Sequence, residues 1–217
     1  MADFERARAH MVEAQIVARG IGNARVLDAL RKVPREKFVE AGMEGRAYED
    51  APLPIGHGQT ISQPFIVAHM IDAAALKPGD RVLEVGAGSG YAAAVMAEIA
   101  GEVCTVERHA ALGERARRCL EALGYANVEL RVGDGTRGWP EKAPFDAIVV
   151  AAAGPAAPAP LKEQLAIGGR LIVPVGEDRR AQRLIRVTRT AADRFEEEDL
   201  GGVTFVPLIG AEGWPDR

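Results

Sequence analysis

Apolar residues recur at helical spacing in three segments of the first 80 residues. Residues 4–17 form one stripe, which stops at Gly20, and residues 26–30 form a second, which stops before Pro34. The third stripe runs from residue 64 to residue 76 and opens on a proline, as many helices do. The pattern therefore predicts three helices in this part of the chain.

Residues 40–63, between the second and third helices, have no sustained periodicity and are rich in glycine and proline. The segment predicts a long loop, and a structureless loop of this length in a compact domain is usually functional or disordered. Its apolar residues, Tyr48, Leu53, Ile55 and Ile61, favour a packed and functional loop.

After residue 79, short apolar strands alternate with helices. We expect strands at 81–85, 103–106, 128–132, 145–150 and 170–175, and helices at 91–99, 109–123 and 161–165. This alternation is typical of a parallel sheet with helices on both faces. Right-handed crossovers then bring the carboxyl ends of the strands, and a ligand crevice, to one edge of the sheet.

The end of the chain follows a different pattern. Residues 183–189 and 194–200 flank a turn at 191–192 and predict an antiparallel hairpin that completes the sheet. Arg183, Arg186 and Arg189 lie on one strand, and the other strand carries four acidic residues, 196–199. A docking surface would explain these charges, but cross-strand pairing on a solvated edge explains them more simply.

Composition narrows the range of functions. The chain has 217 residues, 47% of them hydrophobic and 27% charged, which indicates one globular domain over residues 1–217. A net charge of −4 gives no general attraction to nucleic acid. We expect no signal peptide in the charged first ten residues, and the longest apolar run, 147–153, is too short for a membrane span. Two cysteines, Cys104 and Cys119, predict inert core residues, no metal site and a reducing, cytoplasmic location.

Three alternating glycines, Gly86, Gly88 and Gly90, separate the strand at 81–85 from the next helix. Glycine allows positive φ angles and a close approach of the backbone to a ligand. A dinucleotide fold would place its third glycine at position 91, where Tyr91 stands, and no lysine follows as in a nucleoside-triphosphate loop. The G-x-G-x-G pattern favours S-adenosylmethionine, and a plain tight connection is the alternative.

Acidic residues follow the next two strands. Glu107 comes 21 residues after Gly86, where a carboxylate is well placed to accept hydrogen bonds from both ribose hydroxyls. Asp134, before Gly135, follows the third strand and could accept from the amine of an adenine. A helix-start carboxylate and an ordinary turn would explain the same two residues.

The stretch that precedes the third helix, Gln59-Thr60-Ile61-Ser62-Gln63-Pro64, permits two interpretations. Ser62 or Gln63 could cap the helix, a contribution of about 1 kcal/mol to its stability. The free N–H groups of the helix start, with the hydroxyls of Thr60 and Ser62, could instead bind a carboxylate.

Together these motifs closely resemble the protein-L-isoaspartate O-methyltransferases. The resemblance runs from about residue 11 to residue 214 and is carried by residues 56–64, 84–91, 133–135, 145–149 and 205–208. It implies a doubly wound, Rossmann-like α/β methyltransferase sheet, mostly parallel, with a C-terminal antiparallel hairpin. N-terminal helices and an active-site loop (residues 1–63) would precede the cofactor-binding core and hairpin (residues 64–210).

The family implies a protein-repair enzyme that moves a methyl group from S-adenosylmethionine to the α-carboxyl of L-isoaspartyl residues. The ester collapses to a succinimide, and its hydrolysis returns some normal aspartate. By this match Ser62 is the active-site serine, and Gln59, Thr60 and Ile61 line the substrate site. No role is carried over to Val67 or Ile209, where relatives carry other residues. The residues expected to bind the cofactor are Gly86, Gly88, Ser89, Gly90, Glu107, Arg108, Asp134 and Gly135.

The expected partners are isoaspartyl-containing proteins and peptides, with no nucleic acid and no membrane, and the expected state is a monomer. Two other classes of function are compatible with the cofactor motifs. One is an S-adenosylmethionine-dependent enzyme that methylates a small molecule, and the other is a binding module without catalytic activity.

Overall fold

Seven strands form the central sheet of the computed structural model, which describes residues 3–177 and 181–216. Their order is β5-β4-β3-β6-β7-β8-β9; the first five run parallel to one another, β8 is antiparallel to β7, and β9 is antiparallel to β8. The strands are β3 (Arg81–Val85), β4 (Glu102–Glu107), β5 (Val128–Val132), β6 (Phe145–Val150), β7 (Leu165–Val175), β8 (Gln182–Ala191) and β9 (Arg194–Val203). The fold predicted from the strand-helix alternation is therefore confirmed.

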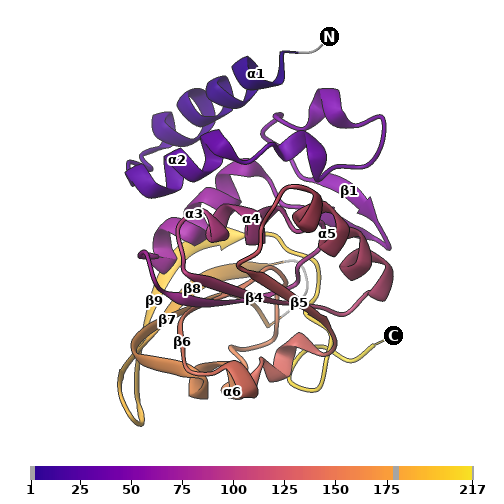
Figure 1. The fold of residues 1–217 in the computed structure, drawn as a ribbon. Coiled ribbons are helices and arrows are strands. Elements are labelled where there is room, and N and C mark those ends of the chain that lie inside the picture. Colours follow the sequence, from indigo (N-terminus) through magenta and orange to yellow (C-terminus); the bar gives the residue numbers. More distant parts are fainter. Residues whose placement is uncertain (1–2, 178–180, 217) are drawn as a thin grey trace.

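Helices cover both faces of this sheet (Figure 1). On one face lie α3, α4 and α5, with the two N-terminal helices stacked above them, and α6 lies on the other face. The helices are α1 (Phe4–Met11), α2 (Ala24–Lys32), α3 (Pro64–Ala74), α4 (Tyr91–Ala97), α5 (Ala110–Ala122) and α6 (Ala159–Glu163). Short 3-10 helices span Val17–Arg19, Arg35–Lys37, Glu44–Arg46, Gly135–Arg137 and Pro140–Lys142.

Alternate residues of the central strands supply two hydrophobic cores. In β3, Val82 packs with the helices α1 to α4, whereas Leu83 and Val85 face the opposite core. In β6, Ala147 and Val149 face the first core, whereas Ile148 and Val150 face the second. Because successive side chains of a strand point to opposite faces, apolar runs with no polar alternation produce a sheet buried on both sides.

Two N-terminal segments differ from the sequence expectation. The first helical stripe is not one α-helix, because α1 ends at Met11 and continues as a π-helical segment, Val12–Ile16. The expected loop at 40–63 contains a hairpin of β1 (Leu53–Gly56) and β2 (Gln59–Ile61). Strands of four and three residues are too short to show a period of two in the sequence.

The C-terminal hairpin forms as predicted, with its charges paired across the strands. Arg183 lies 2.6 Å from the Asp199 carboxylate, and Arg186 pairs with Glu198. Arg189 behaves differently: it donates to the backbone carbonyls of Glu163 and Leu165. Two of the three predicted arginines therefore make cross-strand ion pairs, and the third ties the hairpin to the start of β7.

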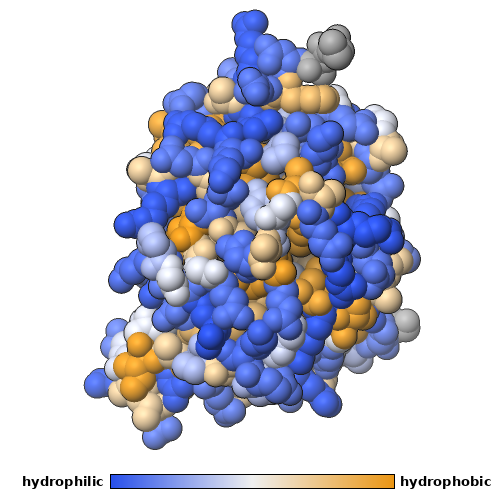
Figure 2. All heavy atoms as spheres, in the orientation of Figure 1, coloured by the Kyte–Doolittle hydropathy of each residue, from blue (hydrophilic) through white to orange (hydrophobic). Residues whose placement is uncertain are grey.

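Hydrophilic residues cover most of the face seen in Figure 2, and hydrophobic residues gather in small groups near its middle. Within residues 3–177 and 181–216, none of the helices combines the length and hydropathy that crossing a membrane requires. Cys104 is buried, Cys119 is half-buried, and both are free thiols. Burial raises the pKa of Cys104 to about 11, in agreement with an unreactive core residue.

Candidate active site

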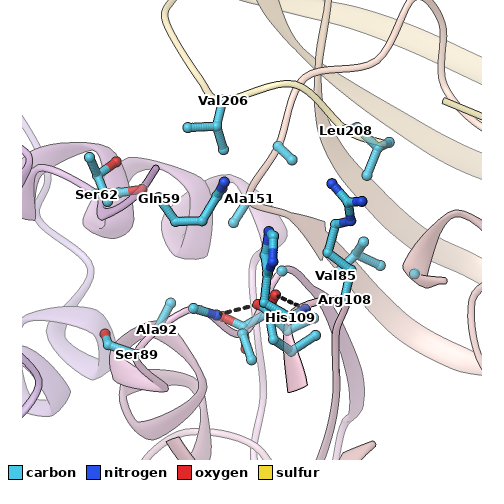
Figure 3. A pocket seen from close by; sticks show the side chains of 18 of the residues that line it. Gln59, Ser62, Val85, Ser89, Ala92, Arg108, His109, Ala151, Val206 and Leu208 are labelled. Atoms are coloured by element: carbon cyan, nitrogen blue, oxygen red, sulfur yellow. Dashed lines mark hydrogen bonds between the residues drawn. The ribbon is translucent and has the colours of Figure 1, made fainter. Parts of the chain in front are cut away.

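One pocket lies at the carboxyl ends of β3, β4 and β6. From β3 the chain adds β4 and β5 on one side of the sheet, and then β6 and β7 on the other side. Ligands of open α/β sheets bind at this kind of switch point. Figure 3 shows Ser62 and Gln59 on one side of the pocket, Arg108 and His109 opposite them, and Val206 and Leu208 above. The lining includes most of the predicted site residues: Gln59, Thr60, Ile61, Ser62, Gly86, Gly88, Ser89, Glu107, Arg108 and Gly135.

The glycine loop has the backbone conformation that its sequence requires. Gly86, Gly88 and Gly90 have φ angles of 95°, 54° and 90°, in the left-handed region that side chains disfavour. The amide of Gly86 donates to the Val106 carbonyl at 2.8 Å, which ties the loop to β4. A Cβ atom on Gly88 would lie 3.1 Å from Ile55 of β1, so the hairpin packs directly on the loop. The loop therefore forms a tight cradle between two strands.

Glu107 ends β4 with its side chain 4% exposed and fixed by two backbone donors. Its Oε2 accepts from the amide of Gly88 and its Oε1 accepts from the amide of His109, both at 2.8 Å (Figure 3). Each carboxylate oxygen can accept more than one hydrogen bond, so both oxygens retain capacity for a ligand hydroxyl. The two amides thus hold the carboxylate at the pocket wall.

A second carboxylate, that of Glu84 in β3, lies beneath the glycine loop and lines the pocket. It is 1% exposed and accepts a hydrogen bond of 2.6 Å from the Thr105 hydroxyl. Burial, reinforced by the charge of Glu107, raises the pKa of Glu84 to about 8 despite the Thr105 hydrogen bond. Glu84 was not among the predicted site residues, although it is the only acidic residue within the apolar strand that precedes the glycines.

The start of α3 tests the capping interpretation of Ser62. The N-cap of α3 is Gln63, and no side chain caps the helix there. Ser62 uses its backbone, because its carbonyl accepts from Arg35 at 2.8 Å. Ser62 makes no capping bond and lines the pocket beside Thr60, so the structure does not support capping, and the binding of a carboxylate stays a prediction.

Two predicted cofactor residues lie outside the pocket lining, Gly90 and Asp134. Gly90 faces α5, where a Cβ atom would lie 3.2 Å from Leu120. The Asp134 carboxylate accepts from the amide and hydroxyl of Thr136 and from the amide of Ala211 at 2.9 Å. These hydrogen bonds lower the pKa of Asp134 and fix the C-terminal segment beside the pocket. An adenine contact by Asp134 stays a prediction.

The sequence interpretation missed three parts of the pocket. His109 lines it, and its ring stacks on His57 of the hairpin turn at 5.4 Å. Ala151 and Ala152 follow β6, and residues 206–209 return from the hairpin to form another wall. The C-terminal wall is held by backbone bonds of 2.8 Å between Ala153 and each of Val206 and Leu208. The apolar motif at residues 205–208 indicated this wall, but no local sequence pattern predicts that it lies beside β6.

In the part of the chain that the structure describes, no three histidine, cysteine or acidic side chains gather as a metal site would require.

Comparisons with known proteins assign the chain to a family. The family model of protein-L-isoaspartate(D-aspartate) O-methyltransferase matches residues 6–213. The chain belongs to this family. Among curated relatives, a protein-L-isoaspartate O-methyltransferase 1 from Rhodopseudomonas palustris (strain HaA2) is 62% identical, over 97% of this chain and 86% of its own length. A protein-L-isoaspartate O-methyltransferase from Brucella anthropi is 56% identical, over 100% of this chain and 99% of its own.

Two solved structures agree with the family assignment. A protein-L-isoaspartate O-methyltransferase matches with a TM-score of 0.85 and 29% identity, over 96% of this chain and 67% of its own. A Plasmodium falciparum structure, described as a protein of this family in complex with S-adenosyl-L-homocysteine, has a TM-score of 0.80 and 28% identity, over 93% and 98% of the two chains. The positive-φ cradle and the anchored Glu107 carboxylate fit a ligand with an adenosine moiety.

Proposed function

We propose that this chain transfers a methyl group from S-adenosylmethionine to the α-carboxyl of L-isoaspartyl residues in damaged proteins and peptides. The resulting ester leads through a succinimide back to aspartate. The main observation in support of this proposal is the set of residues that line one pocket, in a chain that belongs to this family. The pocket joins the glycine loop and Glu107 to the stretch from Gln59 to Ser62.

The glycine loop and Glu107 would hold the cofactor. Glu107 would accept hydrogen bonds from the ribose hydroxyls, Gly86 and Gly88 would let the backbone approach the ligand closely because they lack a Cβ atom, and Ser89 would border it. Arg108 and Gly135 border the same space, and Gly135 is packed so closely that a Cβ atom would lie 2.5 Å from Val85. When bound, the cofactor supplies a methyl group activated by a sulfonium charge.

Ser62 and Thr60 hold the substrate carboxylate by donating hydrogen bonds from their hydroxyls, and Gln59 and Ile61 complete this side of the pocket. The chain need not provide a general base, because a carboxyl with an ordinary pKa of about 4 is already ionised at neutral pH. Its contribution is alignment, which supplies up to about 7–11 kcal/mol of the barrier in well-oriented reactions. The apolar wall at Val206 and Leu208 limits the access of water.

Methyl incorporation into a matched pair of peptides, one isoaspartyl and one aspartyl, tests the proposal. The two peptides carry the same charge but place the carboxylate differently relative to the backbone. Misplacement by about 1 Å can cost on the order of a hundredfold in rate, so we expect a strong preference for the isoaspartyl peptide. The product should release methanol in mild base. Equal rates, or a base-stable product, would contradict the isoaspartyl assignment and favour a methyltransferase with another substrate.

We further infer a monomer that works in the cytoplasm without nucleic acid. The two free thiols and the negative net charge support this inference. Sedimentation of the purified protein and fractionation of cells test it.

A further inference from the structure

Arg35 is completely buried and carries a charge that no carboxylate in residues 3–177 or 181–216 pairs with. It lies in the 3-10 helix that follows α2. Its Nε donates to the Ala47 carbonyl at 2.7 Å, and its Nη2 donates to the Ser62 carbonyl at 2.8 Å. Burying a charge without an opposite charge costs free energy, so a packing role alone does not account for an arginine here.

The bond to the Ser62 carbonyl holds a peptide group that α3 leaves unpaired. The first carbonyl used by α3 is that of Gln63, which accepts from the amide of Val67 at 3.2 Å. The Ser62 carbonyl lies one residue outside the helix, and Arg35 is its donor. Holding this carbonyl fixes the peptide plane between Ser62 and Gln63, and with it the backbone that carries the Ser62 hydroxyl.

The same guanidinium contacts the cofactor side of the pocket. Its central carbon lies 4.7 Å from the centre of the Tyr91 ring, a cation–π contact between two buried side chains. Tyr91 is the first residue of α4, directly after the glycine loop, and it lines the pocket. Its ring is held from another side by Phe38, at 5.6 Å between ring centres.

We propose that Arg35 is a positioning residue for methyl transfer, which sets the placement of Ser62 relative to the glycine loop through its contacts with the Ser62 carbonyl and the Tyr91 ring. Arg35 does not touch the reactants and acts through these two residues. The inference rests on the proposed function, because its effect is on the alignment of carboxylate and methyl group. A displacement of about 1 Å is enough to change such a rate by two orders of magnitude.

The chain offers a matched control in Arg170. Its Nε donates to the Ala74 carbonyl at 2.8 Å and its Nη2 donates to the Ala75 carbonyl at 3.1 Å, at the other end of α3. Arg170, like Arg35, therefore donates two bonds to backbone carbonyls, but its bonds hold the C-terminal end of α3, away from the pocket lining, and it also lies 3.7 Å from the Asp80 carboxylate. Loss of the Arg170 bonds would disturb the C-terminal end of α3, far from Ser62. Loss of the Arg35 bonds would instead displace Ser62, just before the start of the helix.

The experiment compares Arg35→Lys, Arg35→Gln and Arg170→Gln by kcat and KM on an isoaspartyl peptide, Kd for S-adenosylhomocysteine, and Tm. For both Arg35 variants we expect kcat to fall at least tenfold, with the Kd changed less than threefold because the Glu107 contacts remain. Arg170→Gln should keep kcat within twofold. Arg35→Gln leaves no buried charge and provides the measurement if the lysine variant fails to fold. Arg35 variants whose kcat matches that of Arg170→Gln would overturn the proposal.

A double-mutant cycle with Ser62→Ala tests whether Arg35 acts through Ser62. In the Ser62→Ala background, Arg35→Gln should change kcat less than threefold, because the hydroxyl it positions is already gone. A second full tenfold loss would show an independent structural effect and overturn the role. A parent protein that methylates neither peptide would refute the proposed function and this role with it. An active parent with insensitive Arg35 variants would refute the role alone.

Discussion

Substitution of Glu84 by glutamine is expected to stabilise the cofactor-free protein, and to do so more at neutral pH than in acid. The carboxyl is buried under the glycine loop, and its pKa of about 8 in the folded protein lies well above the 4.5 of an ordinary glutamate. Between these two values the folded state binds one more proton than the unfolded state. Folding therefore requires proton uptake, and this group's contribution to stability falls as the pH rises from 4.5 to 8.

The magnitude follows from the two pKa values. Each pH unit between them removes about 1.4 kcal/mol from the free energy of unfolding. At pH 7 the cost of protonating Glu84 amounts to about 3 kcal/mol, and at pH 5 to about 1 kcal/mol. Glutamine has nearly the same shape, needs no proton, and keeps a carbonyl that accepts from the Thr105 hydroxyl. The variant should therefore gain up to about 3 kcal/mol at pH 7, or roughly 6–12 °C in Tm.

Urea unfolding at pH 5, 6, 7 and 8 measures this gain in the parent and in Glu84→Gln. Glu129→Gln is the control, because it removes one negative charge from an exposed position on the neighbouring strand pair β4–β5. The control should show no gain that grows with pH. A constant difference between Glu84→Gln and the parent across this range, or a Glu84 carboxyl that titrates near 4.5, would refute the reasoning.

Three further predictions concern the pocket. Glu107→Ala should raise the Kd for S-adenosylmethionine about 10- to 150-fold, since a charged hydrogen-bonding group contributes about 1.5–3 kcal/mol; unchanged affinity of a folded variant by calorimetry would contradict the ribose assignment. Ser62→Ala and Ser62→Asn should both lower kcat at least tenfold with little change in Tm, and full activity of the asparagine variant would exclude a specific role of the hydroxyl. Gly135→Ala should cost about 1–3 kcal/mol of stability and weaken cofactor binding, because its Cβ atom would lie 2.5 Å from Val85. Gly133→Ala, with open space around the added atom, should change neither quantity.

The parts of the molecule that could be predicted from sequence are those that local patterns encode. The strand-helix alternation after residue 79 could be predicted from the hydrophobic periodicity of the chain and the rule for parallel sheets. The structure has the same elements, with their ends shifted by a few residues. The conformation of the glycine loop was predictable for the same reason. Three alternating glycines allow three positive φ angles, and the structure has them at Gly86, Gly88 and Gly90.

Contacts between segments distant in the sequence could not be predicted from local patterns. Asp134 binds the amide of Ala211, 77 residues away, and the pocket wall at Val206 is fixed by Ala153. The stacking of His57 on His109 joins the hairpin turn to the start of α5. Each of these contacts depends on the three-dimensional fold, because no spacing in the chain distinguishes these residues from ordinary turn or surface positions.

Ser62 shows where local reasoning ends and the structure becomes necessary. A serine two residues before a helix that starts with proline is compatible with capping, and the sequence alone supports that role as well as a role in binding. In the structure the helix is capped without a side chain, and the backbone of Ser62 is held by an arginine 27 residues earlier. The hydroxyl therefore makes no capping bond while its backbone is fixed, and carboxylate binding by this hydroxyl stays a proposal that the Ser62 variants test.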